Sequence, residues 1–245
     1  MKLSIVIPFY NEAATLGELL KRVLAVRLDG VDKEILAVDD GSRDGSAEIA
    51  AHFARQRPDV VRVISFATNG GKGRAVIAGL EQATGEICII QDADLEYDPE
   101  DYRPILEAYH DPDVHVVYGS RILGSGNRSY HRYYWGGRLV TWWTNLLYGS
   151  RLTDEPTCYK SFRRQVLDGL HLTSSGFEFC PEITAKLLRR GYRIVEVPIR
   201  YYPRSFAEGK KIRYSDGLKA VWTLARLRIV TSSGKSCPTR QKVEA

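Results

Sequence analysis

The sequence lacks several patterns that identify other classes of protein. Its four cysteines lie far apart and form no CxxC pair, which argues against a zinc ribbon or a disulfide scaffold and favours reduced thiols in the cytoplasm. The longest stretch without Asp, Glu, Lys or Arg is residues 139–150, which is 12 residues. A membrane-spanning helix needs about 20 apolar residues. The first apolar run ends at Pro8 without a cleavage pattern, so we expect neither a signal peptide nor a membrane span.

Motifs of several enzyme classes are also missing. The five histidines form no HExxH pattern, and the chain has no GxSxG elbow. The glycines of NGGKG at 69–73 do not follow GxGxxG and do not form a P-loop, so a dinucleotide-binding Rossmann enzyme is the weaker interpretation. No nucleic-acid-binding motif is recognisable, which argues against nucleic acid as a partner.

The 245 residues have an ordinary globular composition, with 44% hydrophobic and 27% charged residues. Charge is distributed unevenly along the chain. Residues 1–188 hold 21 Lys/Arg and 26 Asp/Glu, whereas residues 189–245 hold 14 and 4. A basic C-terminal part favours an anionic partner, such as a phosphorylated substrate or an acidic lipid, and a solvated basic face is the alternative.

The first 120 residues alternate between patterns typical of strands and of helices. Short apolar runs predict buried strands, and apolar residues at helical spacing predict helices between them, the second capped by Ser46. This alternation predicts an α/β fold with a mostly parallel sheet, whose strand C-termini share one ligand-binding edge. The expected strands are 3–8, 34–38, 60–66, 86–91 and 114–119, and the expected helices are 12–26, 46–56, 74–82 and one that follows Pro99.

The pattern changes after residue 120. Residues 121–130 are rich in Gly, Ser and Asn and predict a mobile loop. The polar residues 231–245 lack periodicity and predict a disordered tail. Between them we expect helices over 130–148, 181–190 and 215–229 and strands over 159–162 and 193–202.

Two of these helices combine tryptophan with basic residues. Tryptophan favours the headgroup region of a bilayer and basic residues favour anionic lipid, so the two helices predict contact with a membrane surface. The alternative is that the tryptophans fill the core or a dimer interface, because large aromatic side chains are usually buried. The residues concerned are Arg132, Trp135, Arg138, Trp142 and Trp143 in the first helix and Lys219, Trp222, Arg226 and Arg228 in the last.

Clusters of aspartate follow two of the predicted strands. Asp39 and Asp40 follow the second strand, and the D-x-D of Asp92 and Asp94 follows the fourth. Carboxylates this close repel one another unless a cation lies between them. Such oxygen donors suit Mg²⁺ or Mn²⁺, which also bind substrate phosphates. A D-x-D directly after a buried strand, in a chain with a second such cluster, therefore predicts a metal site at the sheet edge.

Eight segments in order resemble the inverting family 2 glycosyltransferases with the GT-A fold, in particular the branch similar to dolichyl-phosphate mannose synthase. The resemblance covers about residues 3–228 and implies one GT-A domain over 1–230, with a nucleotide-sugar-binding half at 1–120 and an acceptor-binding half at 121–230. The segments are VIPFYNE (6–12), VDDGSRDGS (38–46), NGGKGRA (69–75), QDADLEYDPED (91–101), GSR (119–121), TCYKSF (157–162), GFEFCPEI (176–183) and PRSFAEGKK (203–211).

The resemblance implies roles for individual residues in binding the donor. Structural alternatives stand beside three of these roles: Pro8 as the end of a strand, Glu12 in a first helical turn, and an Asx turn at Asp39 or Asp40. The residues implied in nucleotide and donor binding are Pro8, Tyr10, Glu12, Val38, Asp39, Asp40, Lys72, Asp92 and Ala93.

The resemblance also implies which residues hold the metal and the phosphates. Asp94 is the expected metal ligand, and Glu96 stands where some relatives carry a glutamine ligand. Arg121 matches the arginine that follows the fifth strand in the family. Arg204 and Lys210 match a basic pair used on the donor diphosphate and the acceptor phosphate, with plain surface charge as the alternative.

The implied reaction is metal-dependent transfer of one hexose from a nucleotide-diphosphate sugar, such as GDP-mannose or a UDP-sugar, to a polyprenyl phosphate with inversion. No QxxRW motif of the processive sugar polymerases is present, which favours transfer of a single sugar. The alternatives are a nucleotidyltransferase, a glycosyltransferase with a soluble acceptor, and a non-catalytic nucleotide-sugar sensor. The expected location is the cytoplasm, at the surface of the membrane, and a membrane-embedded partner or a homo-oligomer stays open.

Overall fold

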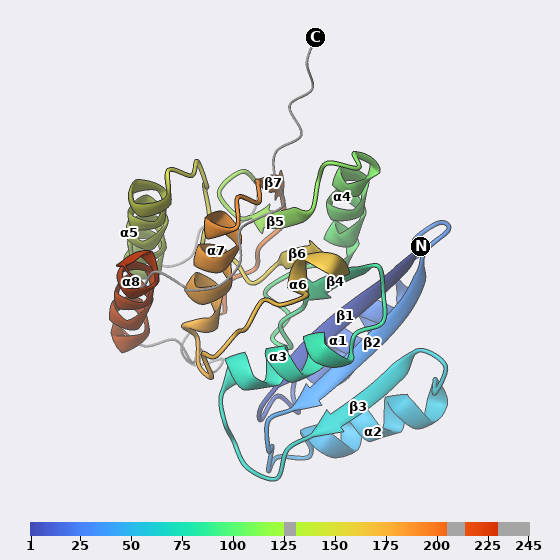
Figure 1. Ribbon diagram of the computed structural model, residues 1–245. Helices are drawn as coiled ribbons and strands as arrows, with labels where there is room; N and C mark the ends of the chain where they lie inside the picture. The colour runs from blue at the N-terminus through green and yellow to red at the C-terminus, as the bar shows by residue number, and fades with distance from the viewer. Residues whose placement is uncertain (125–130, 205–213, 230–245) are drawn as a thin grey trace.

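The computed structural model describes residues 1–124, 131–204 and 214–229 (Figure 1). Three predicted features lie wholly or partly outside this range: part of the 121–130 loop, the segment that holds Lys210, and the C-terminal tail. The described strands are β1 (Lys2–Phe9), β2 (Asp32–Asp39), β3 (Val61–Ser65), β4 (Ile87–Ile90), β5 (Val116–Ser120), β6 (Lys160–Arg163) and β7 (Ile194–Pro198). The helices are α1 (Leu16–Ala25), α2 (Ser46–Gln56), α3 (Lys72–Gln82), α4 (Tyr102–Glu107), α5 (His131–Tyr148), α6 (Arg164–Leu167), α7 (Phe179–Arg189) and α8 (Tyr214–Ile229), with two single 3₁₀ turns, η1 (Pro99–Asp101) and η2 (Ala108–His110).

The strands form one seven-stranded sheet in the order β3-β2-β1-β4-β6-β5-β7. Strands β3, β2, β1 and β4 are parallel, and so are β5 and β7. Strand β6 runs antiparallel to both of its neighbours, β4 and β5. The prediction of an α/β fold with a mostly parallel sheet is confirmed, and the reversed strand joins its two parallel parts.

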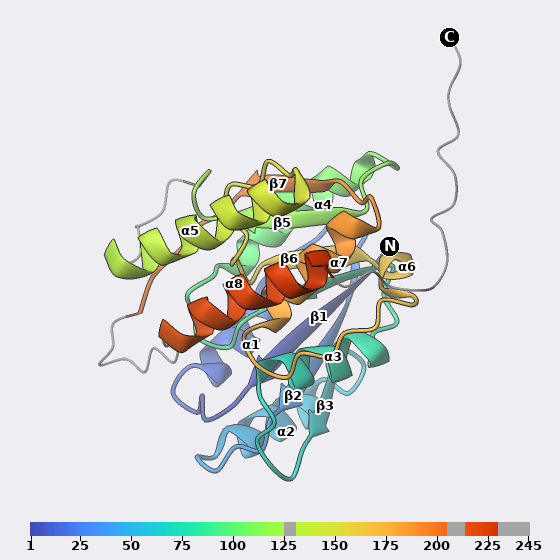
Figure 2. The ribbon, with the colours of Figure 1, turned by 60° about the vertical axis from the view of Figure 1, so that its left-hand side comes forward.

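Helices cover both faces of the sheet (Figures 1 and 2). Strand β1 shows why, because Ile5 and Ile7 pack against one helix layer and Val6 packs against the other. Helices α1, α2 and α4 contribute to the first core, and α3, α6 and α7 contribute to the second. A strand buried on both faces reads as a continuous apolar run, as β1 does.

Several predicted details of the elements differ from the structure. Helix α2 has the predicted bounds, but its N-cap residue is Gly45, at φ 90°, and the expected cap at Ser46 is wrong. The Ser46 hydroxyl instead accepts a hydrogen bond from the backbone N–H of Glu12 at 2.8 Å. Helix α6 was not expected, and β7 ends at Pro198 rather than at residue 202.

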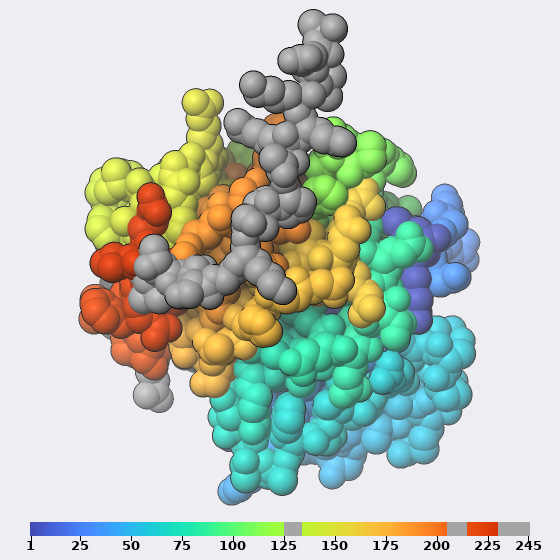
Figure 3. All heavy atoms as spheres, in the orientation of Figure 1, coloured from blue at the N-terminus to red at the C-terminus, as the bar shows by residue number. Residues whose placement is uncertain are grey.

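Helices α5 and α8 pack against α7 and lie outside the two sheet-covering layers (Figure 2). A small apolar cluster joins the three helices through Val140, Ala185, Ala220 and Leu224. In the space-filling view, α5 and α8 form one side of the molecule (Figure 3). No helix in the described ranges is long and apolar enough to cross a membrane.

The predicted stripe on α5 faces outward. Trp135 is 65% exposed and Trp142 is 57% exposed, and Leu139 and Leu146 on the same stripe are also exposed. On α8, Trp222 is 68% exposed. These tryptophans therefore do not fill the core, and of the described tryptophans only Trp143 is half-buried, where its indole N–H donates to the carbonyl of Val221. The two helices present a row of large apolar side chains to their surroundings.

Candidate active site

A cavity of about 620 Å³ lies between the C-terminal ends of the parallel strands and the helices α5, α7 and α8. Its walls come from the ends of β1, β4 and β5, from the start of α3, and from the segment 153–158 that precedes β6. This is the edge at which open α/β sheets bind ligands. The predicted site residues that line it are Pro8, Tyr10, Glu12, Asp40, Lys72, Asp92, Ala93, Asp94, Glu96, Arg121 and Arg204.

The D-x-D follows β4 in a tight turn, in which Leu95 has a positive φ of 61°. Gln91, fully buried, anchors the turn, because its side-chain oxygen accepts hydrogen bonds from the hydroxyls of Tyr102 and Tyr159, each at 2.6 Å. Its side-chain amide also donates to the carbonyl of Asp92 at 2.9 Å. The turn that presents the carboxylates is therefore held by a buried polar network.

Cations meet the carboxylates of this turn. Lys72 Nζ lies 2.5 Å from Asp92 Oδ1, and the Arg204 guanidinium lies 2.9 Å from Asp94 Oδ2. The same guanidinium lies 3.2 Å from Glu12 Oε2. Glu96 accepts hydrogen bonds from the backbone N–H of Arg204 at 2.9 Å and from the hydroxyl of Tyr201 at 3.0 Å. Residues separated by more than 100 positions in sequence thus form one network of charges.

Asp94 is buried beside two other carboxylates. Burial, together with the neighbouring charges of Asp92 and Glu96, raises the pKa of Asp94 to about 7, although the cations Arg204 and Lys72 oppose that shift. A carboxylate in this setting gains from any further positive charge.

The two aspartates at the C-terminal end of β2 make different contacts. Asp39 accepts a hydrogen bond from the backbone N–H of Ser42 at 2.9 Å, three residues on, which is one residue beyond the spacing of an Asx turn. Asp40 accepts from the backbone N–H groups of Gly70 and Gly71, at 3.0 and 2.6 Å, and pairs with Arg74 at 2.7 Å. Each aspartate therefore has a structural contact, and only Asp40 also lines the cavity.

Gly71 shows why the sequence after β3 needs glycine. It has a φ of 100°, and an added Cβ would lie 2.4 Å from the carbonyl oxygen of Ser175. The close approach brings the loop before α7 against the start of α3, where Lys72 begins the helix. Val38 is fully buried in the core and, like Asp39, does not line the cavity, while Lys210 lies outside the described residues.

Arg121 is held by a residue that the sequence did not suggest. Asp154 accepts two hydrogen bonds from the Arg121 guanidinium, both at 2.7 Å, and a third from its backbone N–H at 2.9 Å. Burial alone would raise the pKa of Asp154, but the charge and hydrogen bonds of Arg121 outweigh burial and lower it. The guanidinium also lies over the ring of Tyr201, 5.1 Å from its centre.

Arg138, on α5, also lines the cavity. The sequence predicted it only as part of a helix that contacts a membrane surface. Its guanidinium donates to the carbonyl of Thr153 at 3.0 Å. Lys72, Arg121 and Arg204 each have a carboxylate within 4 Å, whereas within the described ranges Arg138 has none. Its positive charge is therefore not neutralised by the protein residues described.

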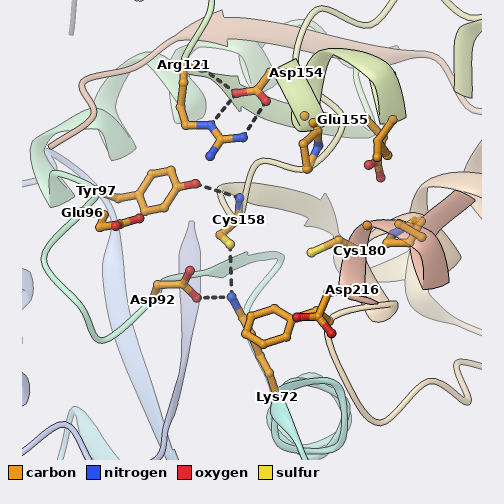
Figure 4. Close-up of a pocket in the computed structure, with 18 of the residues that line it drawn as sticks. Lys72, Asp92, Glu96, Tyr97, Arg121, Asp154, Glu155, Cys158, Cys180 and Asp216 are labelled. Atoms are coloured by element: carbon orange, nitrogen blue, oxygen red, sulfur yellow. Dashed lines mark hydrogen bonds and ion pairs between the residues drawn. The ribbon is translucent and has the colours of Figure 1, made fainter. Parts of the chain in front are cut away.

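Four more cavity residues were not predicted as parts of the site: Asp154, Glu155, Cys158 and Cys180 (Figure 4). Glu155 is fully buried, and neither of its carboxylate oxygens has a hydrogen-bond partner among the described residues. The matches TCYKSF and GFEFCPEI contain the two cysteines, but nothing in those segments shows that they share a wall. Asp154 carries no sequence signal beyond its place shortly before TCYKSF.

The acidic residues of the D-x-D turn suit a hard divalent cation. No group of three metal-binding side chains is gathered in the described part of the chain, and Asp94 is already paired with Arg204. Mg²⁺ in nucleotide sites, however, commonly uses only one or two carboxylates together with substrate phosphates. Asp94 and Glu96 provide those oxygen donors, and a cation would offset the burial and the neighbouring negative charges that raise the pKa of Asp94. The donor chemistry therefore fits Mg²⁺ or Mn²⁺.

Comparison with known proteins identifies the family. The model of the glycosyl transferase family 2 matches residues 4–170, and the chain belongs to this family. Among solved structures, glucosyl-3-phosphoglycerate synthase from Mycobacterium tuberculosis, in complex with Mn²⁺, uridine diphosphate and glucosyl-3-phosphoglycerate, superimposes with a TM-score of 0.69. The match covers 95% of this chain and 82% of that chain at 18% identity, and it shows a GT-A-like fold.

Curated relatives are similar at about 30% identity. Undecaprenyl-phosphate mannosyltransferase of Micrococcus luteus is 32% identical over 230 residues, covering 86% of this chain and 87% of that protein. Dolichol-phosphate mannosyltransferase of Pyrococcus furiosus is 31% identical, covering 86% of this chain. Undecaprenyl-phosphate 4-deoxy-4-formamido-L-arabinose transferase of an Enterobacter species is 30% identical, covering 85%. This chain spans only 59% and 62% of the length of the last two proteins.

Proposed function

We propose that this glycosyltransferase transfers one hexose from a nucleotide-diphosphate sugar to a polyprenyl phosphate, with inversion at the anomeric carbon and with Mg²⁺ or Mn²⁺. The observation that carries the proposal is the continuity of one cavity. It runs from the D-x-D turn to the helices α5 and α8, whose outer faces are apolar. The three relatives compared above are named for transfer involving dolichol or undecaprenyl phosphate, which supports the same acceptor class.

The donor would bind at the strand edge. Pro8, Tyr10 and Glu12 line the end of the cavity at β1, where Tyr10 would pack on the base or ribose and Glu12 would accept a ribose hydroxyl. When bound at Asp94 and Glu96, the metal ion would supply positive charge for the departing nucleoside diphosphate. Lys72 and Arg204 would act on the same phosphates, because each now neutralises a carboxylate with which a phosphate would compete.

The acceptor phosphate would bind on the side of α5. Arg138 has no carboxylate partner in the described ranges. It can therefore bind an anion without first breaking an ion pair, as Lys72, Arg121 and Arg204 would have to. A phosphate monoester is already anionic at neutral pH and can attack the anomeric carbon without a strong general base. Rate enhancement would then come from positioning and from electrostatic stabilisation of the leaving diphosphate.

The acceptor lipid would be reached at a bilayer surface. Trp135 and Trp142 on α5 and Trp222 on α8 are all more than half exposed. Lys219 and Arg226, also exposed, accompany Trp222 on α8 and would favour anionic headgroups. An apolar row flanked by basic residues on a surface helix is typical of a segment that lies in the membrane interface. The proposal therefore places the cavity mouth at the surface where a long polyprenyl chain is anchored.

The test is a donor panel on vesicles. The purified protein is incubated with radiolabelled GDP-mannose and UDP-sugars, a divalent cation, and vesicles that contain acidic lipid and polyprenyl phosphate. We expect label in the lipid fraction, release of one nucleoside diphosphate per sugar, and an inverted anomeric configuration by NMR. Release of pyrophosphate would instead indicate a nucleotidyltransferase, and binding of a donor without turnover would indicate a sensor. Transfer only to water-soluble acceptors would refute the lipid acceptor.

A further inference from the structure

Two cysteines from different elements meet in the wall of the cavity. Cys158 lies in the segment before β6, and Cys180 lies in the first turn of α7. Both are free thiols, and their side chains lie on the same wall of the cavity. Figure 4 shows the sulfur of Cys180 directed toward Cys158, with the sulfur of Cys158 above the ammonium group of Lys72.

The pair is connected to the D-x-D turn through Lys72. Lys72 Nζ donates to Cys158 Sγ at 3.1 Å and lies 2.5 Å from Asp92 Oδ1. The Lys72 side chain is only 17% exposed, so the contact with Cys158 is one of few that set the position of its ammonium group. Any change at the Cys158 sulfur is therefore transmitted directly to a cation beside the first aspartate of the turn.

The surroundings also make one thiol of the pair reactive. The neighbouring Cys158 thiol, helped by the charges of Lys160 and Lys72, lowers the pKa of Cys180 to about 7 against the opposing effect of burial. The interaction with Cys180, together with burial, raises the pKa of Cys158. Cys88 provides the contrast, since burial raises its pKa to about 12 and it lies in the core. A thiolate is the reactive form of cysteine, and a low-pKa thiol beside a second one is typical of a redox-sensitive pair.

We propose that Cys158 and Cys180 are an oxidation site, at which a hydroperoxide converts the two thiols into a reversible disulfide that withdraws Cys158 from Lys72. In the first step the Cys180 thiolate attacks a peroxide oxygen, the O–O bond breaks, and Cys180 becomes a sulfenic acid while an alcohol or water leaves. In the second step the Cys158 sulfur attacks the sulfenic sulfur, the S–S bond forms, and the S–O bond breaks with loss of water. Overall, two thiols are oxidised by two electrons and one hydroperoxide is reduced.

The consequence for the site follows from geometry. A disulfide draws Cys158 Sγ toward Cys180 and leaves it a weaker hydrogen-bond acceptor, so the ammonium group of Lys72 loses its contact on that side. If Lys72 acts on the donor phosphates, a role that rests on the proposed function, oxidation lowers kcat/KM for the nucleotide sugar about tenfold or more. That factor corresponds to one charge-assisted hydrogen bond. Formation of the disulfide itself does not depend on what the enzyme transfers.

The first test is chemical and needs no substrate. The full chain in a Cys237→Ser background, which removes the one cysteine outside the described residues, is treated with hydrogen peroxide, blocked with an alkylating reagent and digested with trypsin. We expect peptides 152–160 and 165–186 to be joined by a disulfide that dithiothreitol releases. Cys88 serves as the internal control and should become alkylated only after denaturation. If peroxide leaves both cavity thiols free, or takes either one only to a sulfinic acid, the proposal is overturned.

The second test separates the oxidation site from the proposed transfer activity. For the Cys237→Ser parent and for Cys180→Ser made in it, the rate of transfer is measured after peroxide and again after dithiothreitol. The ratio of the two rates is the readout, so a change in basal rate cancels. We expect the ratio to fall at least about tenfold in the parent and to stay near one in Cys180→Ser. Equal loss in both proteins would refute the coupling to Lys72. If no donor is transferred at all, the proposed function fails while the peptide test still decides the disulfide.

Discussion

Replacing Asp154 by asparagine tests whether its buried ion pair with Arg121 stabilises the folded protein at the cavity wall formed by the end of β5 and the segment 153–158. The carboxylate makes three hydrogen bonds to Arg121 at 2.7–2.9 Å, and its side chain is only 4% exposed. The substitution keeps the volume and removes the negative charge. The guanidinium, 22% exposed, would then stay in a poorly solvated position without its counter-ion.

The expected cost can be estimated from the burial of the pair. Removing one partner of a buried ion pair costs about 3–5 kcal/mol. The amide oxygen of Asn can still accept one hydrogen bond from Arg121, and the guanidinium is partly exposed, so the lower end of about 3 kcal/mol is expected. For a chain of this length, about 1 kcal/mol shifts the melting temperature by roughly 2–4 °C, so the Asp154→Asn variant should melt about 6–12 °C lower.

The pH dependence gives an independent check of the same pair. The pKa of Asp154 is lowered from its ordinary value of 3.8 in the folded state, because the attraction of Arg121 outweighs burial. A depressed pKa contributes stability that is fully present above the unfolded value and is lost as pH falls through the folded value. The difference in unfolding free energy between wild type and Asp154→Asn should therefore be constant from about pH 7 to 5 and shrink below about pH 4.

The assay is thermal and urea unfolding followed by circular dichroism across this pH range. The matched control is Asp59→Asn, because Asp59 pairs with Arg57 at a similar distance of 3.0 Å but its side chain is 65% exposed. We expect no measurable change in the control, since an exposed pair contributes little. The reasoning would be refuted if Asp154→Asn melted within about 1 °C of wild type, or if its deficit did not depend on pH.

Three further predictions concern the proposed reaction and its surface. Asp94→Ala should abolish metal-dependent transfer while circular dichroism shows an intact fold, and full activity of this variant, or of wild type in excess chelator, would contradict the metal site. Arg204→Ala should lower kcat by about 10²–10³-fold, because it removes a cation that would stabilise the leaving diphosphate, and it should change the melting temperature only slightly. Unchanged donor binding and turnover would exclude a role of Arg204 at the diphosphate. Replacing Trp142 and Trp222 by serine should reduce flotation with acidic vesicles without lowering the melting temperature, because both side chains are exposed, and Arg226→Gln should weaken flotation mainly at low salt. If wild type does not float at low salt, the surface role is lost.

Much of the fold could be predicted because its signals are local. Continuous apolar runs predicted strands, and helical spacing predicted a helix over 12–26, where the structure has α1 at Leu16–Ala25. The stripe of Trp135 and Trp142 on α5 also exists as predicted, but periodicity shows only that the residues share a face. Whether that face is buried depends on which element covers it, and only the packing of α5 and α8 on α7 decided that it is exposed.

The D-x-D turn could likewise be predicted, since a carboxylate pair after a buried strand is a local pattern. The residues that pair with the charged side chains of the site could not be predicted. Arg204 meets Asp94 across 110 positions, and Asp154 meets Arg121 across 33. Such pairs form because the strand order brings separate loops to one edge, and strand β6 enters the sheet against the direction of its neighbours. The sequence named most of the charged residues of the site, but it did not show which charges neutralise one another.

The contrast between Asp39 and Asp40 shows the physical reason for this division. The two residues are adjacent and chemically identical, so no sequence argument separates them. Because successive residues of a strand point to opposite faces, one side chain closes its own turn and the other reaches the glycine loop before α3. Local sequence therefore determines which segments become strands, helices and turns, whereas contacts between distant segments determine which carboxylate, thiol or guanidinium faces the cavity and in what charge state.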